Sequence, residues 1–282
     1  MIFIRFFSLV LLLTAGLFIS VNAAFATTVT FGPSVTASQL NSAIADNNND
    51  VIELTAGTYC PGSMTITANR TRPVIIRPAA GATVIWGGGT SSAFEFKGGA
   101  SYITLEGIIF DGYKIGDTGI IWAGNAHDLT FNKLTWRNSS GATPYKSWAI
   151  YLSKDAGVGV SNITISNATV IGNNRTMSAF TAGYREFSSD ITFRNVDISH
   201  VAYAGYFTDN INNMTVDNWR VVDSGYQTFG NFAVYFSNDN DQLTGVYKDI
   251  CLSNSGTIGN YAAVVNGGNT QTDPPGGCPN PN

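Results

Sequence analysis

The amino-acid sequence predicts an all-β fold, a single-stranded parallel β-helix solenoid with a capping helix at its N-terminal end. An eight-residue phrase recurs, starting at residues 103, 129, 163, 191, 214 and 245. A second strand-like phrase recurs ahead of it, starting at residues 93, 119, 149, 179, 204, 233 and 262. Charged residues make up only 12% of the chain, which also has 30 glycines. Repeats of roughly 20 to 35 residues with strand-type alternation are typical of a stacked solenoid.

The first 26 residues predict a secretory signal. Arg5 supplies the positive start, Phe6–Ile19 the apolar stretch, and Ala24–Ala26 a small-residue cleavage site. We therefore expect a secreted protein, extracellular or periplasmic if the host is bacterial, with no membrane contact after cleavage. An uncleaved anchor is the alternative.

The rest of the chain is expected to form one β-helix domain over residues 27–270, followed by a Pro/Gly-rich tail over 271–282. Residues 35–47 are apolar at helical spacing, which predicts the short helix that shields the edge of the first coil. The formal charge is −4 and no basic stripe is present, so nucleic acid is not an expected partner. We expect a monomer.

The eight-residue phrase predicts two short strands joined by a tight corner. Its positions 1, 3, 6 and 8 are apolar, so the alternation shifts phase by one residue at the middle. Gly and Asn tolerate the left-handed backbone of a sharp bend, and stacked Asn side chains can bond between coils. The corner residues are Gly107, Lys133, Asn167, Asn195, Asn218 and Asp249.

The second phrase predicts a strand that carries tyrosines and hydroxyls in one phase. If that phase points outward, stacked coils form a column suited to saccharides, because sugar rings stack on aromatic faces and sugar hydroxyls bond to Ser and Thr. If it points inward, the tyrosines form an aromatic stack in the core, and alternation alone leaves both open. The candidate substrate-binding residues are Tyr151, Ser153, Tyr206, Thr208, Tyr235 and Ser237.

Three cysteines fit an oxidising compartment. Cys251 lies in the last clear repeat and Cys278 in the tail, so a disulfide between them would pin the tail over the open end of the solenoid. Cys60 is then left over. No cysteine cluster or histidine pair has the spacing of a metal site.

The chain resembles the right-handed parallel β-helix proteins of the pectin lyase-like superfamily, which includes pectate lyases. Its opening coils resemble those of the chondroitinase B and alginate lyase group over roughly residues 45 to 112. The segments that carry this resemblance are Asp50–Tyr59, Arg72–Pro78, Ala80–Val84 and Ser101–Gly112. The resemblance implies a right-handed solenoid and favours β-elimination over hydrolysis.

Lys154 and Arg185 are the candidate catalytic residues. They follow the second phrase on neighbouring coils, and lyases of the chondroitinase B group use a Lys and an Arg placed in that way. The resemblance implies Lys154 as base and Arg185 as the group that neutralises the carboxylate or donates a proton. The chain departs from that group, because it lacks the Asn-Gly-Gly-x-Glu calcium element and an Arg-His-Gly around Arg185. The alternative is two solvated loop-end charges.

Acidic residues suggest a second site. Asp209, Asp239 and Asp241 lie on consecutive coils, where paired carboxylates can perform hydrolysis or hold Ca²⁺. The simpler interpretation is a hydrophilic loop.

The leading hypothesis is a polysaccharide lyase that cleaves a uronic-acid-containing polymer by β-elimination, with an acidic polysaccharide as partner. One alternative is a non-catalytic carbohydrate-binding or adhesion protein. The other is a glycoside hydrolase that uses Asp209 and Asp239.

Overall fold

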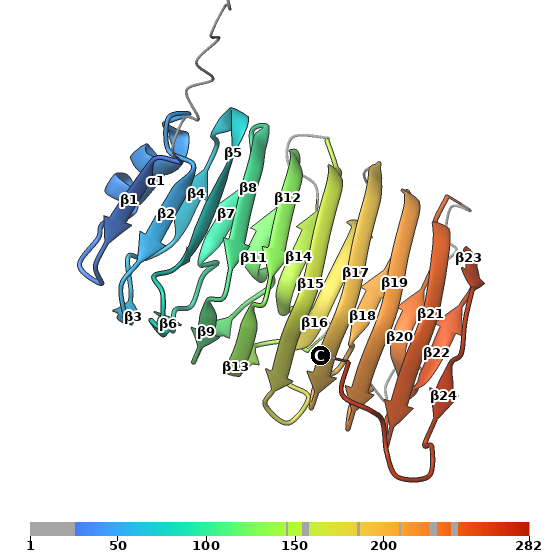
Figure 1. Cartoon of the computed structure of the whole chain (residues 1–282). Coiled ribbons are helices and arrows are strands. Elements are labelled where there is room, and N and C mark those ends of the chain that lie inside the picture. Colours follow the sequence, from blue (N-terminus) through green and yellow to red (C-terminus); the bar gives the residue numbers. More distant parts are fainter. Residues whose placement is uncertain are drawn as a thin grey trace, which may run out of the picture.

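A computed structural model describes residues 26–144, 146–153, 158–184, 187–208, 210–225, 230–237 and 242–281. It is a parallel β-solenoid in which successive coils stack along one axis from the N-terminal helix to the last strands (Figure 1). The predicted fold class is confirmed. In the described part of the chain the strands form two sheets, and every strand pair is parallel.

The larger sheet, called the long-strand sheet here, has 16 strands. They are β1 (Thr28–Phe31), β2 (Val51–Leu54), β3 (Gly57–Tyr59), β5 (Asn69–Pro78), β6 (Val84–Gly87), β8 (Ala100–Glu106), β9 (Ile109–Asp111), β10 (Lys114–Ile115), β12 (Ala126–Asn132), β13 (Thr135–Gly141), β15 (Val160–Gly172), β17 (Ser188–Ser199), β19 (Ile211–Val222), β21 (Thr244–Ser253), β23 (Ala263–Asn266) and β24 (Gln271–Thr272).

The smaller sheet, called the short-strand sheet here, has eight strands, one from each successive coil. They are β4 (Met64–Ile66), β7 (Phe94–Phe96), β11 (Gly119–Ala123), β14 (Trp148–Ser153), β16 (Ser178–Tyr184), β18 (Gly205–Phe207), β20 (Phe232–Phe236) and β22 (Thr257–Asn260). This sheet is built from the second repeated phrase and carries the candidate site.

The predicted corner is present in every long coil. Backbone φ is positive at each of the expected corner residues, with 52° at Asn167, 53° at Asn195 and 55° at Asn218. The Asn195 amide donates to Asn167 Oδ1 at 3.0 Å, and the Asn218 amide donates to Asn195 Oδ1 at 2.9 Å. The strands β15, β17, β19 and β21 run through this corner without a break. The predicted asparagine ladder is therefore confirmed.

A second ladder, which the sequence analysis missed, forms where the long strands begin. Asp128, Asn162, Asp190 and Asn213 also have positive φ, and they occupy equivalent positions on successive coils. The Asn213 amide donates to Asp190 Oδ1 at 2.7 Å, and Asn162 donates to Asp128 in the same way. Each carboxylate here accepts from the amide on the next coil, so these bonds join the coils two by two.

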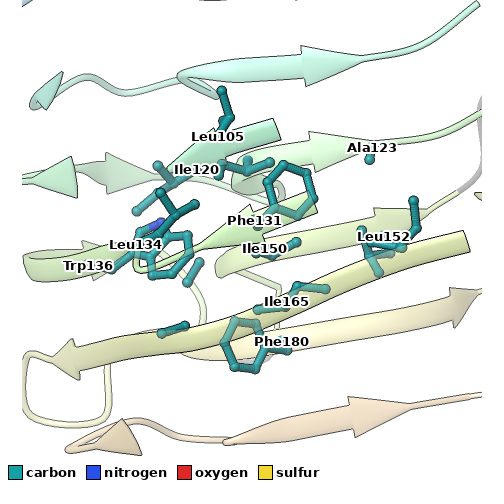
Figure 2. Close-up of a cluster of buried hydrophobic side chains, with 14 of the residues drawn as sticks. Leu105, Ile120, Ala123, Phe131, Leu134, Trp136, Ile150, Leu152, Ile165 and Phe180 are labelled. Carbon is teal, nitrogen blue, oxygen red and sulfur yellow. The ribbon is translucent and has the colours of Figure 1, made fainter. Parts of the chain in front are cut away.

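The interior is filled from both sheets. Leu105, Phe131 and Ile165 lie in register on β8, β12 and β15 and are fully buried. Figure 2 shows them with Ile150, Leu152 and Phe180 from the short-strand sheet, all in one cluster. Because these positions are the apolar ones of the two phrases, the core follows directly from the repeat.

The predicted helix over residues 35–47 is α1 (Ala37–Ala45), slightly shorter at each end. Thr36 caps its start in a capping box with Gln39, and its buried side chains Leu40, Ala43 and Ile44 face the first coils. Arg70, which is 1% exposed, closes the other end by donating to the carbonyls of Ile44, Asp46 and Asn49. No helix in the described part is long and apolar enough to cross a membrane.

The predicted disulfide between Cys251 and Cys278 is present, and Cys60 is free and exposed. The expectation that the tail covers the open end holds only for β24, which pairs with β21, and is wrong for the later tail residues. Arg220 Nε donates to the Cys278 carbonyl at 3.2 Å, and the Asn218 amide donates to the Pro281 carbonyl at 3.2 Å. Since Arg220 and Asn218 belong to β19, the tail runs back along the side of the long-strand sheet (Figure 1).

Candidate functional site: an aromatic groove on the short-strand sheet

The tyrosines of the second phrase lie on the outer face of the solenoid. Tyr151, Tyr206 and Tyr235 are partly exposed, whereas the residues that flank them along each strand are buried. They belong to one register column that crosses the short-strand sheet. From the N-terminal side the column reads Glu95, Trp122, Tyr151, Thr181, Tyr206 and Tyr235. Of the two arrangements left open by the alternation, the structure has the outward one.

A second row of rings stands beside this column. Trp148, Tyr203 and Phe232 each lie three residues before one of the tyrosines. Trp148 and Tyr203 are 3% and 1% exposed, and they form a cluster separate from the main core. Their rings stack with centroids 6.4 Å apart.

The rings are in contact across coils. Tyr206 lies 5.2 Å from both Tyr203 and Tyr235 and 6.1 Å from Trp148, measured between ring centroids. Phe232 lies 5.2 Å from Tyr235. Offset and edge-to-face ring pairs at these separations contribute about 0.5–1.5 kcal/mol each beyond burial. The aromatic groove, defined by Trp148, Tyr151, Tyr203, Tyr206, Phe232 and Tyr235, is therefore a connected surface.

A cavity of about 600 Å³ opens in this groove. It exists because β16, between the Trp148/Tyr151 coil and the Tyr203/Tyr206 coil, carries small residues where its neighbours carry rings. Ser178 is paired with Trp148, and Thr181 is paired with both Tyr151 and Tyr206. At Ser178 the rings of Trp148 and Tyr203 meet across β16, so the space opens at Thr181, between Tyr151 and Tyr206.

The hydroxyls predicted for the site differ in their placement. Thr208 lines the cavity and is 5% exposed, and its Oγ1 is buried without a hydrogen-bond partner. A buried hydroxyl left unpaired costs about 1–3 kcal/mol, and this oxygen has almost no surface exposed to the cavity. Ser237 is 1% exposed and does not line the cavity, and the side chain of Ser153 lies outside the described structure.

One ion pair stands at the rim of the cavity. Lys146 Nζ lies 3.2 Å from Asp117 Oδ2, and both side chains are about half exposed. An exposed pair of this kind contributes roughly 0–1 kcal/mol to stability. Either group can therefore leave the pair and bond to a ligand hydroxyl at little cost.

The candidate catalytic and metal residues lie outside the described residues, namely Lys154, Arg185, Asp209, Asp239 and Asp241. Lys154 directly follows the last residue of β14, and Arg185 directly follows the last residue of β16. Among the residues that the structure describes, no group of three or more His, Cys, Asp or Glu side chains could hold a metal ion.

Sequence reasoning missed the second row of rings, although a signal for it exists. An aromatic residue, then Ala, then any residue, then Tyr occurs three times, starting at Trp148, Tyr203 and Phe232. The corresponding stretch of β16 begins at Ser178 and ends at Thr181. The repeated pattern identifies the strands that carry the rings, and its absence from β16 identifies the strand that lacks them.

No family model and no curated protein matches the chain. Among solved structures, an alginate lyase from Paenibacillus sp. str. FPU-7 is 13% identical with a TM-score of 0.48, covering 88% of this chain and 95% of that one. PfbA, a surface adhesin of Streptococcus pneumoniae, is 12% identical with a TM-score of 0.41 (86% and 81% covered). The pectin methylesterase from Aspergillus niger is 13% identical with a TM-score of 0.39 (90% and 85% covered). All three are less than 25% identical to this chain with TM-scores below 0.5, and similarity at this level assigns no activity.

Proposed function

We propose that this chain binds a polysaccharide in the aromatic groove. The observation that carries the proposal is the cavity of about 600 Å³ at Thr181, bounded by Tyr151 and Tyr206 and lined further by Trp148, Tyr203 and Thr208. Apolar ring faces suit the C–H faces of sugars, and hydroxyls beside them suit sugar hydroxyls.

The finer form of the proposal is a secreted lyase that acts on a uronic-acid-containing polymer. Lys154 and Arg185 follow the two strands that contribute Tyr151 and Thr181 to the groove. In that reaction Lys154 takes the proton beside the carboxylate, the bond to the leaving oxygen breaks as a carbon–carbon double bond forms, and the leaving oxygen gains a proton. Arg185 neutralises the carboxylate or donates that proton.

Binding is tested by filling the cavity. Thr181→Tyr restores the ring that β16 lacks, and we expect it to abolish retention of the protein in affinity gels that contain alginate, polygalacturonate, chondroitin sulfate or a neutral β-glucan. The matched control is Thr164→Tyr, the same substitution at a partly exposed position of the long-strand sheet. Retention of Thr181→Tyr equal to wild type on every polymer would overturn the proposal.

Cleavage is tested separately on the polymers that are retained. A lyase produces an unsaturated uronate, whose ultraviolet absorbance rises with time. We expect Lys154→Ala and Arg185→Ala to abolish this rise while binding persists. Binding by the wild type without any absorbance change would leave a carbohydrate-binding or adhesive protein as the function.

A further inference from the structure

The register column of the aromatic groove continues beyond the cavity. On β11, Trp122 is paired with Tyr151 on one side and with Glu95 of β7 on the other. Trp122 is partly exposed, and its strand neighbours Ile121 and Ala123 are fully buried, so the indole lies on the outer face. Sequence analysis did not single out this tryptophan.

Two polar side chains position the indole of Trp122. Lys97 Nζ lies over its ring, 5.7 Å from the centroid. The same ammonium lies 3.1 Å from Glu95 Oε2, which also accepts from Thr65 Oγ1 at 3.2 Å. The outward tryptophan thus has an ammonium over one ring face and a carboxylate beside that ammonium, which combines an aromatic ring with groups that bond sugar hydroxyls.

We propose that Trp122, with Lys97 and Glu95, forms a second saccharide subsite, and that the polysaccharide runs parallel to the solenoid axis from Tyr235 to Trp122. This rests on the proposed function and adds the direction and minimum length of the ligand. A chain laid along the axis meets an aromatic ring on four of the five coils from β20 to β11, and the cavity on the fifth. A chain laid along a strand leaves the rings after a few residues, since β18 has only three.

The spacing of the coils supports the axial direction. Adjacent parallel strands lie about 4.8 Å apart, so four coil steps from Tyr235 to Trp122 span roughly 19 Å. A pyranose residue in an extended chain is about as long as one coil is high, so successive sugars meet successive coils. A disaccharide fills the cavity alone, whereas a hexasaccharide reaches both the cavity and Trp122.

The described charges along this line do not select one sign. Glu95 pairs with Lys97 near Trp122, and Asp117 pairs with Lys146 at the cavity. Each pair offers both an acceptor and a donor to hydroxyl groups. The subsite at Trp122 therefore serves recognition of sugar hydroxyls and ring faces, and the preference for a uronate or a neutral sugar is set elsewhere.

The test is calorimetric titration with disaccharides and hexasaccharides of four series: galacturonate, mannuronate, chondroitin sulfate and cellulose. For the series that binds, we expect Trp122→Ala to weaken hexasaccharide binding by about 10-fold or more and to leave disaccharide binding unchanged. Trp122→Phe retains a ring and most of the affinity, and circular dichroism checks that each variant is folded. Thr181→Tyr is expected to abolish binding of both lengths.

The outcomes separate the two proposals. Hexasaccharide binding that is unaffected by Trp122→Ala but lost in Thr181→Tyr would overturn the axial subsite and leave the cavity as the binding site. Equal loss of disaccharide and hexasaccharide binding in Trp122→Ala would also contradict a separate subsite. If the wild type binds none of the oligosaccharides, the proposed function fails, and the subsite fails with it.

Discussion

Tyr206 and Tyr235 stack on the outside of the solenoid with their ring centroids 5.2 Å apart and their planes inclined by 21°. The two residues are paired in register on β18 and β20. The separation of the rings is therefore set by the spacing of coils, which in a parallel sheet is about 4.8 Å. The same column carries a ring on four of the five coils from β11 to β20, so these rings follow the stacking axis of the coils.

Tyr206→Ala is expected to weaken polymer binding by about 30-fold, or about 2 kcal/mol, because Tyr206 contacts three other rings of the groove. Titration of the variant with the polymer that the wild type retains measures the change. The control is Tyr102→Ala, since Tyr102 is 39% exposed and packs against His127, away from the groove. An equal loss in both variants would contradict a localised site.

Much of the fold could be predicted because its determinants are local. The phase shift inside each phrase places Asn167, Asn195 and Asn218 at a bend, and a bend needs a residue that tolerates positive φ. The same rule failed for the second ladder. Asp128 and Asp190 lie just before each phrase, where no alternation marks a corner.

The site was harder to predict than the fold. Tyr206 lies between Gly205 and Phe207, and a strand that is apolar in both phases gives no clue to which side faces water. The cavity depends on the absence of rings at Ser178 and Thr181, which is visible only when coils are compared. The path of the tail depends on Arg220 and Asn218, whose side chains donate to backbone carbonyls 58 and 63 residues away.

Asn195 combines a left-handed backbone with two ladder hydrogen bonds, one donated to Asn167 and one accepted from Asn218. Asn195→Ala loses both bonds and keeps a side chain at φ 53°, so we expect the free energy of unfolding to fall by about 3 kcal/mol. Asn195→Gly loses the same bonds without the steric cost and should be about 1 kcal/mol more stable than the Ala variant. Urea denaturation measures both, and the reverse order would contradict strain at this corner.

Asp111 makes stability depend on pH at low pH. Its carboxylate accepts from Asn138 Nδ2 and Arg137 Nε, each at 2.8 Å. These hydrogen bonds, first that from Asn138 and then that from Arg137, hold the pKa of Asp111 below its usual value against the opposing effect of partial burial. The unfolded pKa is about 3.9, so the stabilisation is complete above that pH and is lost as the pH falls through the lower folded pKa.

We therefore expect Asp111→Asn to lower the melting temperature most near neutral pH. The difference from wild type should shrink as the pH falls below about 4, where the wild-type carboxyl also becomes neutral. Thermal melts over this range measure it. A difference that stays constant with pH would mean that the carboxylate charge has no part in the interaction.

The disulfide between Cys251 and Cys278 should stabilise the chain without affecting the groove. It closes a loop of 27 residues, and loop-closure entropy predicts a stabilisation of about 3.5 kcal/mol at 25 °C when the chain unfolds as one unit. The paired change Cys251→Ser and Cys278→Ser should lower the free energy of unfolding by up to that amount. It should also speed proteolysis after Asp273, because the tail then loses its covalent link to β21 and keeps noncovalent contacts such as those with Arg220 and Asn218. Cys60→Ser is the control, since Cys60 is unpaired.

The tail lies against the long-strand sheet and the groove lies on the short-strand sheet, so polymer affinity should not change. A loss of affinity as large as that in Tyr206→Ala would show that the two faces are coupled through the core.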